Sequence, residues 1–134
     1  MMNEDLKALI EGAQQLEEWF GYWPGFHDAE VLSLDIRSNQ PSLLRLYFWH
    51  TDWNEVDEQG YFRRSKFVTV NFVFEDVASC ELVGFNHGEG VTFGLEIRHQ
   101  EDLFRVELYP CVGVAGNVTA RRLRIELTPG EIQR

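Results

Sequence analysis

The sequence predicts an α+β domain in which one N-terminal helix packs on a predominantly antiparallel β-sheet of about seven to eight strands. Two patterns support this fold class: apolar residues recur with helical spacing over residues 4–20, and they alternate with polar residues over much of residues 29–130. The segments between the predicted strands are short, and connections of that length suit hairpins rather than parallel crossovers. With 134 residues and no linker or repeat, the chain is expected to form one domain over residues 1–134.

The helix is predicted over residues 4–20 because its apolar side chains recur at steps of three and four residues. They are Leu6, Leu9, Ile10, Ala13, Leu16, Trp19 and Phe20. Asn3 is expected to cap the free amides of the first turn. Gly21 is expected to end the helix in a left-handed conformation, and Pro24 prevents the helix from resuming.

Strands are predicted where the period of the pattern falls to two or where β-branched and aromatic residues cluster. The predicted strands are residues 32–37, 43–50, 67–75, 81–85, 91–98, 103–109 and 121–128. Turn residues rich in Gly, Asn, Asp and Pro separate several of them, including residues 39–42, 86–90 and 113–116.

Charge and composition narrow the classes of partner. The chain has 22 acidic and 12 basic residues, a net charge of −10, so phosphate backbones and anionic membranes would repel it. We therefore expect neither nucleic acid nor a membrane as a ligand, and a cationic partner suits the charge better. No apolar run approaches the roughly 20 residues of a membrane-spanning helix, and the acidic N-terminus is unlike a signal peptide. A cytoplasmic location is expected.

Known catalytic and cofactor-binding motifs do not occur in the sequence. It has no phosphate-binding loop, no dinucleotide-binding glycine pattern, no nucleophile elbow and no HExxH zinc motif. The segment from residue 52 to 63 resembles a calcium loop but has Val56, Asp57 and Arg63 at positions that calcium binding requires to be different. Cys80 and Cys111 lie in apolar strand-like segments, so we expect free, buried thiols. The sequence thus predicts no enzyme, no cofactor and no metal.

Histidines and carboxylates leave one alternative open. His27, Asp28, His50, Asp52 and His87 could form a metal or acid–base site if their side chains met in one cleft. Adjacent residues on a strand point to opposite faces, which argues against His27 and Asp28 holding one ion. The preferred interpretation is that these two side chains hold the turn after the helix.

A segment of aromatic and acidic residues is the predicted partner-binding surface. Its residues are Trp49, Asp52, Trp53, Glu55, Asp57 and Glu58. Large aromatic side chains are common anchors of protein–protein contacts, and acidic residues accelerate the encounter with a basic partner. The alternative is a solvated acidic loop whose tryptophans cover the end of the sheet.

Three blocks of the sequence resemble the immunity protein 50 family. Residues 23–32 read WPGFHDAEVL, residues 82–87 read LVGFNH, and residues 123–130 read LRIELTPG, in the order that this family shows. The likeness extends over residues 15–130. The chain departs from the family pattern at Gly25, where serine is usual, at residues 88–90, and over residues 111–117.

The resemblance implies a function and a partner. Such proteins are small cytosolic antidotes, encoded beside a secreted polymorphic toxin, that bind their cognate toxin and neutralise it without catalysis. It implies a toxin protein as the partner, basic if the toxin attacks nucleic acid. The chain itself is expected to be a monomer or a homodimer, since a sheet that does not close leaves edges through which two copies can pair. The family-signature residues, expected to be structural, are Trp23, Phe26, His27, Asp28, Asn86 and His87. The alternatives are a small metal-dependent or His/Asp-dependent enzyme and an adaptor protein with an unrelated partner.

Overall fold

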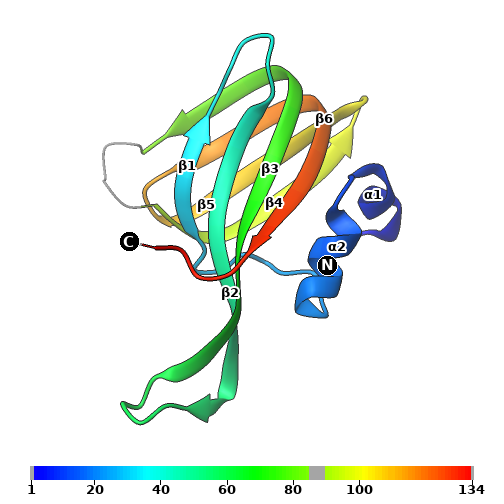
Figure 1. Ribbon diagram of the computed structural model, residues 1–134. Coiled ribbons are helices and arrows are strands. Elements are labelled where there is room, and N and C mark those ends of the chain that lie inside the picture. The colour runs from blue at the N-terminus through cyan, green and yellow to red at the C-terminus, as the bar shows by residue number, and fades with distance from the viewer. Residues whose placement is uncertain (1, 85–89, 134) are drawn as a thin grey trace.

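The structure, a computed structural model, describes residues 2–84 and 90–133 and has an α+β fold. Two short helices precede six strands in the described part of the chain (Figure 1). The elements are α1 (Glu4–Leu9), α2 (Ala13–Phe20), β1 (Glu30–Asp35), β2 (Ser42–Val56), β3 (Phe62–Val83), β4 (Val91–Gln100), β5 (Leu103–Val112) and β6 (Ala115–Pro129). All strand pairs are antiparallel, and they close into a barrel in the order β1-β2-β3-β6-β5-β4. The predicted α+β class with an antiparallel sheet is confirmed.

The described residues form fewer strands than the seven to eight that the sequence predicted. The predicted strands 67–75 and 81–85 belong to one long strand, β3. Asp76 takes a left-handed φ of 55°, and the register with β6 shifts between Val77 and Ser79. This bulge bends the strand without ending it, and a bend of this kind helps a sheet to curve into a barrel. Asp76 and Ser79 are polar and lie between the two predicted strands, so the alternation of apolar residues is interrupted there.

The predicted single helix over residues 4–20 is also wrong, because the chain breaks at Gly12. Gly12 has a φ of 88°, and a Cβ atom there would lie 1.8 Å from the carbonyl oxygen of Ile125. The backbone of Glu11 instead pairs with β6, where its carbonyl accepts the amide of Ile125 at 2.7 Å. Across the break, the buried Lys7 of α1 donates to Glu17 of α2 at 2.7 Å.

The predicted ends of the helical segment are confirmed. The Asn3 side chain accepts a hydrogen bond from the amide of Asp5 at 2.7 Å, which caps the first turn. At the other end Gly21 has a left-handed φ of 84° and its amide bonds to the carbonyl of Glu17.

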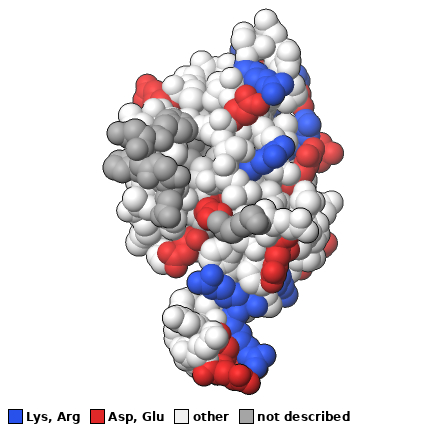
Figure 2. Space-filling view, turned by 60° about the vertical axis from the view of Figure 1, so that its left-hand side comes forward, with Lys and Arg blue, Asp and Glu red and all other residues white. Residues whose placement is uncertain are grey.

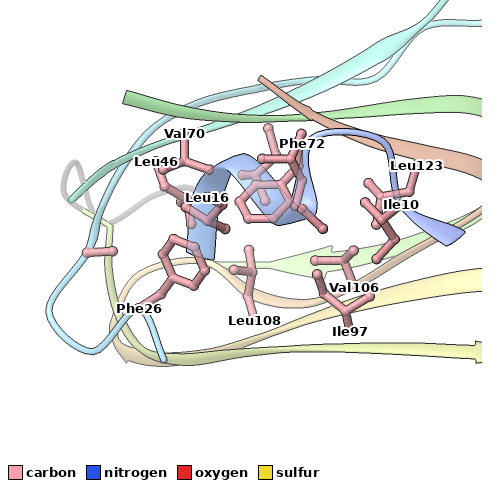
Figure 3. Close-up of a cluster of buried hydrophobic side chains, with 14 of the residues drawn as sticks. Ile10, Leu16, Phe26, Leu46, Val70, Phe72, Ile97, Val106, Leu108 and Leu123 are labelled. Carbon is pink, nitrogen blue, oxygen red and sulfur yellow. The ribbon is translucent and has the colours of Figure 1, made fainter. Parts of the chain in front are cut away.

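The core lies inside the barrel, and α2 contributes to it. Leu16 of α2 is fully buried and lies near Leu46 and Val70 of the sheet, with Phe26 beside it (Figure 3). The other buried strand residues of this cluster include Leu44, Phe48, Val68, Phe72, Phe74, Ile97, Phe104, Val106, Leu108, Val118, Ala120, Leu123 and Ile125. The helix therefore packs against the concave face of the sheet, where it fills space that the strands alone leave open.

Strands β2 and β3 continue beyond the barrel as a projecting hairpin, which we call the arm (residues 51–64). Its pairing is given by Thr51↔Arg64, Asp52↔Arg63 and Val56↔Phe62. Figure 1 shows it reaching away from the rest of the molecule. The sequence predicted an acidic loop here. The structure corrects this prediction, because residues 51–56 belong to β2 and residues 62–64 to β3.

The barrel closes where β1 meets β4, through the single pair Glu30↔Val91. Backbone hydrogen bonds on both sides of this pair strengthen the contact: the Val31 amide to the Gly90 carbonyl at 2.7 Å and the Thr92 amide to the Ala29 carbonyl at 2.9 Å. The seam fixes the turn at residues 26–29 against β4. Among the described residues, no helix has the length and apolar character needed to cross a membrane.

Candidate functional site

The arm exposes large aromatic side chains. Trp53 is 68% exposed and Tyr61 is 69% exposed, and Phe62 is exposed beside them. The rings of Trp53 and Phe62 meet nearly edge to face, with centroids 4.9 Å apart. Two-stranded hairpins are marginally stable in water, and exposed aromatic groups of this size are typical anchors of protein–protein contacts. The arm therefore combines a weakly supported backbone with a surface suited to binding.

Trp53 lies in an irregular part of β2, where the pairing with β3 is interrupted. Asp52 pairs with Arg63 and Val56 with Phe62, so residues 53–55 of β2 have no opposite residue in β3. The Asp52 carboxylate accepts the amide of Asn54 at 2.9 Å, which organises this segment. Asp52, one of the predicted binding residues, thus has a defined structural contact within the arm.

The charges of the arm are mixed rather than purely acidic. Arg63 lies opposite Asp52, and its Nε is 3.6 Å from a carboxylate oxygen of Glu55. Arg64 lies over the ring of Trp49, 4.7 Å from the centroid, as in a cation–π contact. Figure 2 shows basic side chains near the base of the arm and acidic ones at its far end. The negative charge that the sequence placed on this surface is concentrated at the tip.

At the tip, two predicted binding residues differ in what they contact. The Asp57 carboxylate accepts the amides of Gln59 and Tyr61, each at 2.9 Å, so this residue shapes the turn. Glu58 is exposed, and it has no ion pair or side-chain hydrogen bond within residues 2–84 and 90–133. Glu58 is therefore the acidic group most available to a partner.

Beside the arm lies an open hollow of about 780 Å³. It is lined by Asp28, Trp49, Thr51, Trp53, Asp57, Gly60, Tyr61, Phe62, Arg63 and Arg64. Because Asp28 belongs to the turn after α2, the hollow joins the arm to the barrel seam. Aromatic walls with two guanidinium groups suit a protruding apolar or acidic side chain of a partner.

The base of the arm is anchored by aromatic packing. The half-buried Trp49 lies against Tyr47 and Phe67, with ring centroids 5.5 and 6.3 Å away. On the following residue, Nδ1 of His50 is 2.8 Å from the hydroxyl of Tyr22. Burial raises the pKa of the Tyr22 hydroxyl above its usual value of 10.0, so Tyr22 stays protonated and can donate this hydrogen bond.

The residues of the alternative His/Asp site do not all meet. His27 and Asp28 lie together, with Nδ1 of His27 3.2 Å from Oδ2 of Asp28. Among the described residues, the side chain that completes a group of metal-ligand type with them is Cys111, not His50 or Asp52. His87 and Asn86 lie outside the described residues.

The expectation that His27 and Asp28 point apart is wrong, because they occupy a turn and not a strand. Phe26 and Asp28 both have left-handed φ angles, 60° and 69°. Phe26 is fully buried and its carbonyl accepts the Thr92 hydroxyl, and the Asp28 amide bonds to the Thr92 carbonyl at 2.9 Å. The side chains of His27 and Asp28 are 59% and 57% exposed, so backbone contacts and Phe26 hold the turn.

Both cysteines are free, as predicted, but neither is buried. Cys111 Sγ lies 3.7 Å from the carbonyl oxygen of Thr92. Cys111 and Thr92 were missed as site residues, because only the pairing of β4 with β5 brings them beside the turn. No signal in the sequence identifies that contact. Trp23, the remaining signature residue, packs half-buried against the core.

No protein-family model matches this chain, and neither does any curated protein or solved structure. The resemblance to the immunity protein 50 family stays a prediction from the sequence.

Proposed function

We propose that this chain is a non-catalytic immunity protein that neutralises a cognate secreted toxin domain by binding it through the arm and the hollow beside it. The observation that carries the proposal is the projecting arm, which exposes Trp53, Tyr61 and Phe62 next to that hollow. The sequence resemblance supports the class of partner, and the exposed aromatic residues support the choice of binding surface.

The exposed aromatic groups support a binding role on energetic grounds. A tryptophan or tyrosine side chain offers roughly 150–250 Å² of surface, and burying apolar area contributes about 25 cal/mol per Å². With about two-thirds of each residue's surface in water, Trp53 and Tyr61 could each gain roughly 3 kcal/mol when a partner covers them. Gains of this size are typical of the few residues that dominate an interface.

The charges suggest how the partner would approach. A basic toxin surface would be attracted by the net charge of −10 and guided to Glu55 and Glu58 at the outer part of the arm. Arg63 and Arg64 then face whatever enters the hollow. On this proposal the aromatic groups set the lifetime of the complex, and the acidic groups set its rate of formation.

The test is co-expression with the toxin domain encoded by the neighbouring gene, followed by measurement of cell survival and of the dissociation constant. The variant W53A/Y61A should weaken binding at least 100-fold, about 2.7 kcal/mol, and abolish protection. Val83→Ser is the matched control, since Val83 is also 68% exposed but lies at the opposite end of β3.

Equal binding by W53A/Y61A and the wild type would exclude the arm as the interface. Tight binding without protection of the cells would favour the adaptor alternative. Turnover of a small molecule by the purified chain would favour the enzyme alternative and overturn the proposal.

A further inference from the structure

We propose that His27, Asp28 and Cys111 form a binding site for a zinc-class divalent cation at the seam of the barrel. One ligand atom from each of the three side chains lies within 4.8 Å of the other two. In a tetrahedral site with bonds of about 2.0–2.3 Å, ligand atoms are separated by roughly 3.3–3.8 Å. The separation of 3.2 Å between His27 Nδ1 and Asp28 Oδ2 is already close to that value. Small rotations of exposed side chains suffice to close the remainder.

The backbone places these side chains together in a defined way. The left-handed φ angles at Phe26 and Asp28 turn two adjacent side chains toward the same side of the chain. The carbonyl of Thr92 then contacts both halves of the site: it accepts the Asp28 amide at 2.9 Å and lies 3.7 Å from the Cys111 sulfur. Residues far apart in the sequence are thus held around one backbone oxygen of β4.

The donor set selects the class of ion. A thiolate, an imidazole and a carboxylate are the ligands that Zn²⁺ accepts, whereas Ca²⁺ and Mg²⁺ prefer oxygen ligands alone. The ring of His27 packs edge-on against Phe93, with centroids 5.1 Å apart, which restricts its orientation. Three protein ligands leave a fourth position for water or for a group from a partner.

An ion bound at this site should stabilise the fold, because the site lies at the β1–β4 seam. His27 and Asp28 lie on the turn before β1, and Cys111 lies near the end of β5, so a bound ion joins segments on both sides of the β1–β4 seam. Since a single residue pair joins β1 to β4, an ion that binds only the folded chain should raise the melting temperature. Asp28 also lines the hollow beside the arm, so the open coordination position lies near the proposed binding surface.

The experiment uses the reduced full-length chain titrated with Co²⁺ and then with Zn²⁺. The wild type should bind one equivalent of Co²⁺ with a thiolate-to-metal charge-transfer band in the near ultraviolet, and Zn²⁺ should displace it. Cys111→Ser should lose the band, and His27→Gln should weaken Zn²⁺ binding at least tenfold. Cys80→Ser is the matched control, because Cys80 is the other exposed free thiol, and it should behave as the wild type.

Absence of the band in the reduced wild type, or its retention in Cys111→Ser, would overturn the proposal. So would an equal loss in Cys80→Ser, since it would indicate non-specific binding by surface thiols. A melting curve of each variant without metal verifies folding. If Cys111→Ser fails to fold, Asp28→Asn serves as the test variant. It keeps an oxygen but removes the charge, so it should weaken Zn²⁺ binding. Metal binding is measured without the toxin, so its outcome is independent of the proposed neutralising function.

Discussion

The amide of Ile125 in β6 donates a hydrogen bond of 2.7 Å to the carbonyl of Glu11, between the two helices. This contact joins the N-terminal segment to the last strand of the barrel, 114 positions later in the numbering of the chain. It requires Gly12 next to it, because the backbones approach too closely there for any side chain.

Gly12→Ala should be severely destabilising. The left-handed φ of 88° costs an alanine about 1–2 kcal/mol, and the overlap of its Cβ with the Ile125 carbonyl should bring the total above roughly 4 kcal/mol. Gly21→Ala is the control, since Gly21 has a φ of 84° but open space around it, so it should lose only the conformational part. Urea unfolding of both variants measures the difference. Equal losses would show that the close approach to Ile125 has no energetic weight.

Asp57→Ala should loosen the tip of the arm while leaving the barrel intact. The variant loses the acceptor for the amides of Gln59 and Tyr61, so hydrogen exchange in residues 57–61 should accelerate. Global stability should fall by less than about 1 kcal/mol, since the arm lies outside the core. Asp57→Asn keeps an acceptor oxygen and should exchange nearly as slowly as the wild type. If Asn and Ala variants exchange alike, the charge of Asp57 and not its hydrogen bonding shapes the turn.

Thr92→Val should destabilise the seam by up to about 1.5 kcal/mol. Thr92 is 1% exposed and its hydroxyl donates to the carbonyl of Phe26, which would lose this donor and keep only the amide of Ala29 at 3.2 Å. Thr92→Ser retains the hydroxyl and should lose only the methyl group, about 1 kcal/mol. Thermal or urea unfolding measures the loss of stability in each of these variants.

His27→Ala should change the stability of the protein little in the absence of metal, because the His27 side chain is largely exposed. A loss as large as that of Thr92→Val would contradict the finding that backbone contacts hold this turn.

Glu96→Gln should alter the dependence of stability on pH. Hydrogen bonds from Arg98 at 2.7 Å and then from Tyr109 at 3.1 Å lower the pKa of Glu96 below its usual value of 4.5. A carboxyl group whose pKa is lower in the folded state stabilises that state above its unfolded pKa and loses the effect as the pH falls through the folded pKa. The variant should therefore be less stable than the wild type near neutral pH.

The same difference should disappear at low pH, and it should be small because Glu96 is partly exposed and screened. Unfolding of the wild type and of Glu96→Gln, measured from about pH 7 to about pH 3, gives this difference in stability as a function of pH. Glu58→Gln is the control for simple loss of negative charge. A difference that is independent of pH would contradict the assignment to the Glu96 carboxylate.

Much of the architecture was readable from local patterns. The period of the apolar residues identified the helical segment and the strands, and Asn3 and Gly21 marked its ends, because capping depends on neighbours in sequence. The same logic failed at Gly12 and at Asp76. Gly12 lies inside the predicted helix and Asp76 lies between two predicted strands. Only the contacts with β6 show that the chain breaks at the first position and that one strand continues through the second.

The candidate site could likewise be predicted only in part from the sequence. The composition of residues 49–58 singled out an aromatic and acidic surface, but pairing with β3 turned it into a projecting arm with Arg63 and Arg64 on the opposite strand. The sequence by itself determined the α+β class, the charge and the candidate residues, since these follow from residue types and short-range spacing. Only the tertiary structure decided that Cys111 lies beside His27 and Asp28, because strand register and left-handed turns combine residues whose separation along the chain carries no local signal.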